Sequence, residues 1–173
     1  MKNSIIIFLF LSISTLVSAQ EGFKIGIQAG LPHNDFNAVT GVVVGADIGY
    51  SFGVNEVLDL GASVGIIHAF PETFKEGTSD LDLPSLQFSN VAADVRVWTS
   101  NSFSFGGKLG YGFSLNDTEQ SGLYYRPTIG YLMSAQTEIN VSYTAIQFEN
   151  ASWTTITIGL LYTFDSGKGL RGR

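Results

Sequence analysis

The segment Ser152–Phe164 carries an apolar residue at every second position over its last nine residues. Ile156, Ile158, Leu160 and Tyr162 follow this spacing, and the segment ends on the aromatic Phe164. Because consecutive side chains of a β-strand point to opposite faces, one face of this strand suits hydrocarbon and the other is built from threonine and glycine. The pattern predicts a strand that separates an apolar environment from a polar one.

Seven further segments have the same alternating character, which makes eight candidate strands. An even number is required of a single-chain bacterial transmembrane barrel, and most of the segments reach the ~9–11 residues that a tilted spanning strand needs. Strands of soluble sheets usually hold about 5–6 residues. The sequence therefore predicts an all-β protein, an eight-stranded antiparallel up-and-down transmembrane β-barrel. The candidate strands are Phe23–Leu31, Thr40–Phe52, Val57–Phe70, Val91–Thr99, Ser102–Leu115, Gly122–Met133, Glu138–Phe148 and Ser152–Phe164.

The composition agrees with one glycine-rich β domain. The chain has 173 residues with 20 glycines, 4 prolines and 14% charged residues, which suits neither a helical bundle nor a disordered segment. It contains no cysteine, so a disulfide framework and a thiolate metal site are both excluded. No cofactor is expected.

The strand faces opposite the apolar ones hold four positive and four negative side chains. In an eight-stranded barrel the interior is only just wide enough for side chains, and most strand glycines share this charged face. We therefore expect a plugged polar interior in which paired charges offset each other's desolvation. A proton or ion path is the alternative interpretation. The expected interior charge network is Lys24, Asp47, Asp59, Asp94, Arg96, Lys108, Arg126 and Glu138.

Aromatic residues gather near the ends of the candidate strands, as in the two interfacial girdles of membrane barrels. One expected girdle includes Phe23 and Phe164, and the other includes Phe148 and Trp153. Pro127 falls on an outward position and removes one ladder donor, so we expect a local bulge there.

With its even strand count, alternating faces and a last strand that ends on Phe164, the chain resembles the small bacterial outer-membrane β-barrel family of the OmpX/OmpA type. The resemblance implies the outer membrane of a Gram-negative bacterium and a monomer in contact with outer-membrane lipids and lipopolysaccharide. It also implies that the barrel-insertion machinery reads the C-terminal strand. Short turns such as Ser100–Asn101 alternate with longer connections, which places the short turns and both termini in the periplasm.

The ends of the chain are expected to lie outside the barrel. Lys2, the apolar run Ile5–Val17 and the small residues before Gln20 predict a cleaved signal peptide over residues 1–19. The barrel then occupies residues 20–164. Residues 165–173 carry three basic side chains and three glycines, and they predict a short basic periplasmic tail.

The outward loops are strongly acidic. They hold eight carboxylates against Lys75 alone, a net charge of minus seven. Such a field favours divalent cations or basic surface partners and repels nucleic acid. A merely solvated loop surface is the simpler explanation. The candidate surface-interaction loop lies within Pro71–Pro84 and includes Glu72, Phe74, Glu76, Asp80 and Asp82. It lacks the ligand spacing of a dedicated calcium loop.

The two histidines are the candidate catalytic residues, because some barrels of the superfamily that this chain resembles modify lipid with a histidine at the outward rim. His33 and His68 both fall at that rim. Neither has an adjacent serine, and a nucleophile, a base and an orienting group are all required within reach. We therefore expect no enzyme, with a lipid A-modifying enzyme that uses His33 or His68 as the alternative.

The expected function is a structural or surface-interaction role through the acidic extracellular loops. The alternatives are a rim-located lipid-modifying enzyme, a narrow channel or hydrophobic-molecule transporter, and a secretion-system accessory barrel.

Overall fold

A computed structural model describes residues 22–33, 40–71, 74–76, 79–81, 85–116, 121–149 and 151–165. The expected signal peptide therefore lies outside the described residues, as does the tail beyond Asp165. No helix among the described residues is long and apolar enough to cross a membrane.

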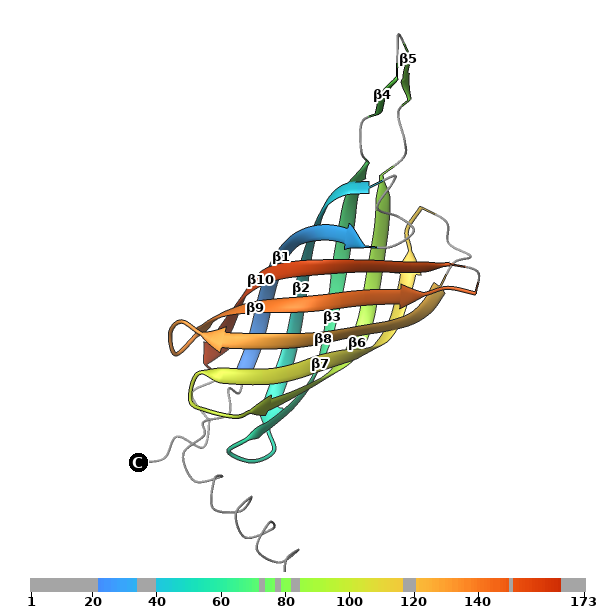
Figure 1. Cartoon of the computed structure of the whole chain (residues 1–173). Helices are drawn as coiled ribbons and strands as arrows, with labels where there is room; N and C mark the ends of the chain where they lie inside the picture. The colour runs from blue at the N-terminus through green and yellow to red at the C-terminus, as the bar shows by residue number, and fades with distance from the viewer. Residues whose placement is uncertain are drawn as a thin grey trace, which may run out of the picture.

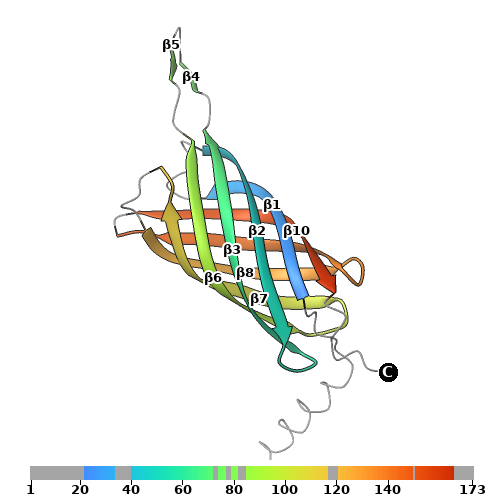
Figure 2. The ribbon, with the colours of Figure 1, turned by 180° about the vertical axis from the view of Figure 1, so that it is seen from behind.

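Eight long antiparallel strands close into a barrel, and a short hairpin stands apart from them (Figures 1 and 2). Around the barrel the order is β1-β10-β9-β8-β7-β6-β3-β2, so each strand pairs with its neighbours along the chain and β1 pairs with β10. The expected fold class is confirmed. The barrel strands are β1 (Gly22–His33), β2 (Thr40–Gly53), β3 (Leu58–Pro71), β6 (Leu86–Trp98), β7 (Phe103–Ser114), β8 (Ser121–Leu132), β9 (Thr137–Gln147) and β10 (Ser152–Asp165), and the hairpin is β4 (Phe74–Glu76) with β5 (Ser79–Leu81).

The two ends of the barrel differ. Gly22 at the start of β1 is paired with Asp165 at the end of β10, so the described chain begins and ends at the same rim. The tight turns 54–57, 99–102 and 133–136 lie at this rim, which we call the turn end. The β4–β5 hairpin projects from the opposite rim, the loop end (Figure 1).

The longest connection is shorter than the sequence suggested. The strand expected to begin at Val91 begins at Leu86, because Leu86–Asn90 continue the ladder with β3 up to the pair Ala69–Leu86. Leu86 and Phe88 alternate with polar residues, but they point inward, with the opposite parity to the exposed Val91, and the sequence does not link the two patterns into one strand. The β4–β5 hairpin occupies part of the remaining connection and was not expected.

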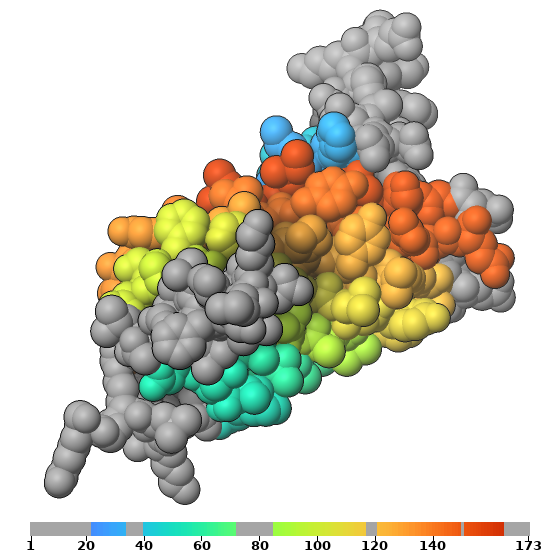
Figure 3. Space-filling model, turned by 60° about the horizontal axis from the view of Figure 1, so that its bottom comes forward, coloured from blue at the N-terminus to red at the C-terminus, as the bar shows by residue number. Residues whose placement is uncertain are grey.

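The two faces of the sheet separate by residue type, as the alternation predicts. Outward side chains are apolar and exposed, with Ile158 61% and Leu109 60% accessible, whereas Arg126 and Glu138 are buried. In space-filling view the side chains of β8, β9 and β10 lie side by side along the outer wall (Figure 3). The apolar residues therefore form the outer skin of the barrel and the charged residues fill its interior.

Pro127 interrupts a ladder without changing its register. On β8 and β9, Tyr125 pairs with Ala145 and Thr128 pairs with Ser142, so the register is the same on both sides of the proline. Two pairs are missing between them. The bulge expected at Pro127 is therefore wrong, and the register shift in this barrel lies between Thr40 and Val43.

Replacing Pro127 by valine should stabilise the barrel. The valine N–H supplies the donor that the proline lacks, and an unpaired backbone group in hydrocarbon costs several kcal/mol. The loss of proline rigidity in the unfolded chain opposes this by about 0.4–1 kcal/mol. We expect a net gain of about 1 kcal/mol or more, measured as a higher urea midpoint in detergent micelles. Ile129→Val, on the same face with its ladder intact, is the control. A midpoint for Pro127→Val at or below that of the wild type would contradict the interpretation.

Candidate functional site

The interior of the turn-end half is organised around Asp47. Its two carboxylate oxygens bind different cations, with Oδ1 2.5 Å from Lys108 Nζ and Oδ2 3.1 Å from Arg126 Nη1. Lys108 and Arg126 come from the neighbouring strands β7 and β8, and Asp47 comes from β2, which lies across the barrel from them. Asp47 therefore links opposite sides of the cylinder through its centre.

Three further ion pairs surround this centre. Arg96 Nη1 contacts Glu138 Oε2. Lys108 Nζ also lies 3.8 Å from Asp94 Oδ2. Lys24 Nζ lies 3.9 Å from Asp59 Oδ2, which is beyond hydrogen-bond distance. The structure thus brings all eight residues of the expected interior charge network into ion pairs, and seven of the eight strands contribute them.

Neutral polar side chains support the ion pairs, and the sequence reading did not single them out. Trp98 Nε1 donates to Asp59 Oδ2 at 2.9 Å, and Ser63 Oγ donates to Asp94 Oδ1 at the same distance. Arg126 Nε donates to Ser142 Oγ, also at 2.9 Å. Charges this deeply buried are tolerated only when further hydrogen bonds satisfy them. Residue parity was the signal that could have found these partners, because each lies on the charged face of its strand.

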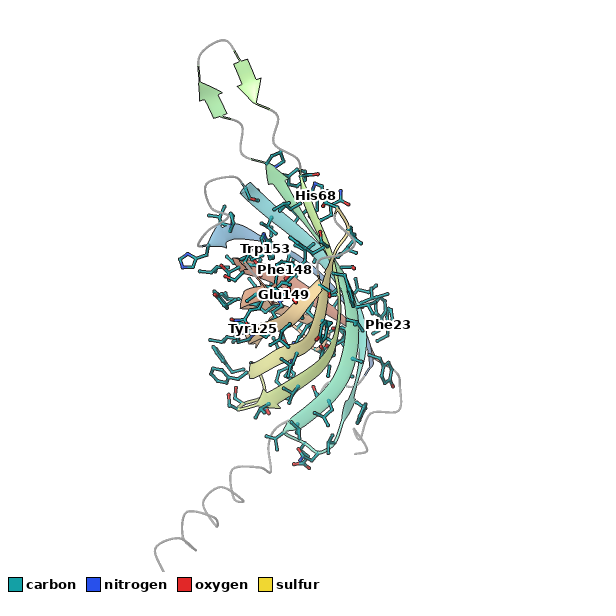
Figure 4. All side chains as sticks on the ribbon, turned by 90° about the vertical axis from the view of Figure 1, so that its right-hand side faces the viewer. Phe23, His68, Tyr125, Phe148, Glu149 and Trp153 are labelled. Carbon is teal, nitrogen blue, oxygen red and sulfur yellow. The ribbon has the colours of Figure 1, made fainter. Side chains whose placement is uncertain are left out.

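The loop-end half of the interior contains a cluster of buried apolar side chains. Trp153 packs against Phe88 with ring centroids 4.9 Å apart, and Phe148 also contacts Phe88, with ring centroids 5.9 Å apart. Figure 4 shows Trp153 and Phe148 close together. We call the buried members the apolar seal: Val43, Ile67, Ala69, Phe88, Ala92, Tyr124, Ile146 and Trp153.

The position of Trp153 corrects the sequence analysis. It was assigned to an outward aromatic girdle, but its side chain is 0% accessible and lies inside the barrel. The reason is parity, because Trp153 shares its face with Thr155 and Thr157, and it pairs with the buried Ile146 of β9. Phe148 was assigned to the same girdle and instead packs partly buried against the seal.

The two histidines lie at the loop end. His68 points outward on β3, where its ring packs edge-on against Phe70 at 4.4 Å (Figure 4). The backbone carbonyl of His33 accepts a hydrogen bond from Thr154 Oγ1. Among the described residues, neither imidazole is hydrogen-bonded to another side chain.

The acidic loops are described only in part. Glu72 and Asp82 lie outside the described residues, and Phe74, Glu76 and Asp80 belong to the β4–β5 hairpin. Glu149 is exposed beside the seal, near Phe148 (Figure 4). Within the described part of the chain, no group of three or more potential metal ligands comes together.

Comparison with known proteins identifies this architecture. The family model described as "Outer membrane protein beta-barrel domain" matches residues 4–164. The chain belongs to this family. It is an outer membrane β-barrel protein, so the exposed apolar skin faces lipid and the buried ion pairs face the barrel axis. A search of curated proteins found no match.

Solved structures with the same fold include natural and designed membrane barrels. The crystal structure of Ail, the attachment invasion locus protein of Yersinia pestis, superposes with a TM-score of 0.60 at 18% identity, covering 86% of this chain and 100% of Ail. Ail in complex with the heparin analogue sucrose octasulfate gives a TM-score of 0.58 at 17% identity, with the same coverage. A de novo designed transmembrane β-barrel gives 0.53 at 16% identity, covering 86% of this chain and 100% of the design. These similarities establish the shared fold.

Removing the charge of Asp47 should destabilise the barrel strongly. Asp47→Asn leaves two buried cations without their shared counter-charge, and breaking a buried pair costs about 3–5 kcal/mol. The matched control is Asp94→Asn, because the Asp94 side chain is 27% accessible and its pair with Lys108 is longer. We expect this variant to lose about 1 kcal/mol or less. Urea unfolding in detergent micelles measures both, and equal losses would show that Asp47 is not the centre of the network.

Proposed function

We propose that this protein is a closed outer-membrane barrel that acts as a scaffold for its outward loops and conducts neither ions nor small solutes. The observation that carries the proposal is the filling of the interior by two unlike layers. Ion pairs around Asp47 occupy the turn-end half, and the apolar seal occupies the loop-end half. Any solute would have to displace both layers.

Barrel size supports a closed interior. Eight strands leave an interior just wide enough to be filled by side chains, whereas porins with 16–18 strands leave an aqueous channel. The glycines of the charged face show how little space remains. A methyl group at Gly26 would lie 3.2 Å from the carboxylate atoms of Asp47. The interior has room for its long charged side chains because the neighbouring glycines have no side chain.

The orientation that we propose places the turn end in the periplasm and the loop end outside the cell. Bacterial outer-membrane barrels join their strands by short periplasmic turns and longer extracellular loops. The turns 54–57, 99–102 and 133–136 are short, and the β4–β5 hairpin extends from the opposite rim (Figure 1). Gly22 and Asp165, the first and last described residues, then face the periplasm, and the β4–β5 hairpin faces the medium.

The role that we propose for the loops is contact with basic partners at the cell surface. Ail has been solved with sucrose octasulfate, which is a polyanion. The outward loops of this chain carry a net charge of minus seven and would repel such a ligand. Charge complementarity therefore favours a basic protein surface or divalent cations as partners, in spite of the shared fold.

Vesicles test whether the barrel is closed. Liposomes containing the wild-type protein should lose potassium no faster than liposomes without protein. Phe88→Ala combined with Trp153→Ala opens the apolar seal and should increase the flux. Ile158→Ala, on the lipid-facing side, is the control and should leave the flux at the background rate. Potassium flux through the wild type at the rate of the double variant would contradict a closed barrel.

Binding to charged surfaces tests the role of the loops. The wild-type protein in nanodiscs should bind immobilised polylysine and should not bind immobilised heparin. Neutralising Glu76, Asp80 and Asp82 as amides should weaken polylysine binding, most clearly at low salt, because exposed charges are screened beyond about 10 Å at 0.1 M salt. Neutralising the interior-lining Asp94 as the amide should have no effect. Heparin binding by the wild type would contradict the proposed partner class.

A further inference from the structure

A group of polar side chains interrupts the apolar outer wall of the barrel near the loop end. On β6, Phe88 packs inward with the apolar seal, so its neighbours Gln87 and Ser89 point outward. His68 on β3 also points outward, and it lies directly opposite Gln87 in the ladder (Figure 4). We call His68, Gln87 and Ser89 the polar patch.

Exposed apolar side chains surround the polar patch on the described strands. Ser89 lies between Ile66 of β3 and Phe113 of β7, which are its direct partners in the two ladders. The patch is therefore a polar site within the lipid-facing skin and not a part of the acidic loops. The surrounding side chains are 37–60% accessible, and they are Val44, Ile66, Phe70, Val91, Phe113 and Leu115.

The three side chains of the patch lie close enough to contact one ligand. Directly opposite residues of an antiparallel ladder have Cβ atoms about 4.5–5.5 Å apart, and diagonal neighbours lie about 7–8 Å apart. Gln87 is the direct partner of His68, and Ser89 is a diagonal neighbour of His68. None of the three side chains is hydrogen-bonded to another described residue, so all of them are available to a ligand.

The patch offers hydrogen-bond donors and no negative charge. An imidazole N–H, an amide NH₂ and a hydroxyl group can all donate to one oxyanion. No described outward position on β2, β3, β6 or β7 carries a carboxylate that would repel an anion. Polar groups that face hydrocarbon without a partner are costly, so the ligand must bring acceptors to the edge of a hydrocarbon layer. The phosphate of a membrane lipid meets this condition, because it is joined directly to the part that carries the acyl chains.

The wall on the turn-end side of the patch leaves space for acyl chains. Four residues from Ser89 along β6, about 13 Å away at the rise of a strand, Ala93 lies opposite Ala62 of β3. The next ladder partners on either side are the larger Tyr50 and Leu109, which are 47% and 60% accessible. The two alanines therefore form a low section of the wall between taller side chains.

We propose that the polar patch binds the phosphate of one membrane lipid at the loop-end margin of the apolar skin. His68, Gln87 and Ser89 donate to the phosphate oxygens, and the acyl chains lie over Ala62 and Ala93. The site is on the outer wall, separate from the interior ion pairs and from the outward loops. It therefore depends neither on a closed barrel nor on what the loops bind.

The chain offers a matched control for this site. His33, Gln147 and Ser152 are the same three residue types at the loop ends of β1, β9 and β10. Glu149 lies in the connection between Gln147 and Ser152, where its carboxylate would repel a phosphate. Replacing these three residues by alanine removes the same chemical groups from the barrel as replacing the polar patch, but leaves the proposed site intact.

Lipid retention in native mass spectrometry tests the proposal. The full barrel, in a detergent without phosphate, is mixed with phosphatidylglycerol or with diacylglycerol of the same acyl chains. The wild type should retain one phosphatidylglycerol and little diacylglycerol. Alanine at all three patch positions should lower phosphatidylglycerol retention about tenfold or more, because hydrogen bonds to a charged group are lost, and the control variant should retain it. Equal retention of the two lipids by the wild type, or of phosphatidylglycerol by the two variants, would overturn the proposal.

Solution NMR of the wild-type barrel with ¹⁵N-labelled glutamine locates the lipid. Titration with phosphatidylglycerol should shift the side-chain amide signal of Gln87 and leave that of Gln147 in place. Inorganic phosphate at the same concentration should shift neither signal, because it brings no acyl chains to the wall. A Gln87 signal that stays in place with the lipid, or that moves equally with inorganic phosphate, would overturn the assignment. Should the patch variant fail to fold, this titration decides the proposal alone.

Discussion

Hydrocarbon offers no hydrogen bonds to a backbone, and this constraint determines the rest of the structure. Every N–H and C=O of a spanning segment must find a partner within the protein, which a sheet achieves only by closing on itself. Here closure joins Gly22 to Asp165 and continues along the whole of β1, up to the pair His33–Thr154. Once the sheet is closed, every second side chain points into a narrow interior. A side chain on the interior face then cannot move to the outer face without a change of strand register. The apolar skin and the ion-paired interior are both consequences of this closure.

Charged and apolar side chains lie at different heights along the barrel axis. Long charged side chains fill the turn-end half, where each carboxylate has a cation within 4 Å. Aromatic and aliphatic side chains gather in the loop-end half, together with buried hydroxyl groups such as those of Thr144 and Thr155. Ion pairs alone would leave spaces that water enters, and apolar packing alone would leave no place for the charges. The charged and the apolar side chains therefore occupy different heights along the barrel axis.

The sequence predicted the barrel well because its main signal is local. Alternation identifies a strand and its outward face from a few residues, so strands such as β10 and charges such as Arg126 were placed correctly. Errors arose where alternation is weak or was not followed to the strand end. Leu86–Asn90 belongs to β6, but its apolar residues face inward whereas those from Val91 onward face outward, so one alternation does not run through the strand. Trp153 was assigned by its residue type and not by its parity, although the parity of Thr155 and Thr157 already places it inside.

Pairing across the interior could not be predicted in the same way. Parity shows that Asp47, Lys108 and Arg126 share the interior face, but which of them meet depends on the stagger of strands that are not neighbours. Asp47 reaches Arg126 although the two lie on opposite sides of the closed sheet. The division into a charged and an apolar half depends on the same stagger, because it aligns the loop-end residues of every strand at one height. Sequence determines which residues enter the barrel, and closure determines which of them meet.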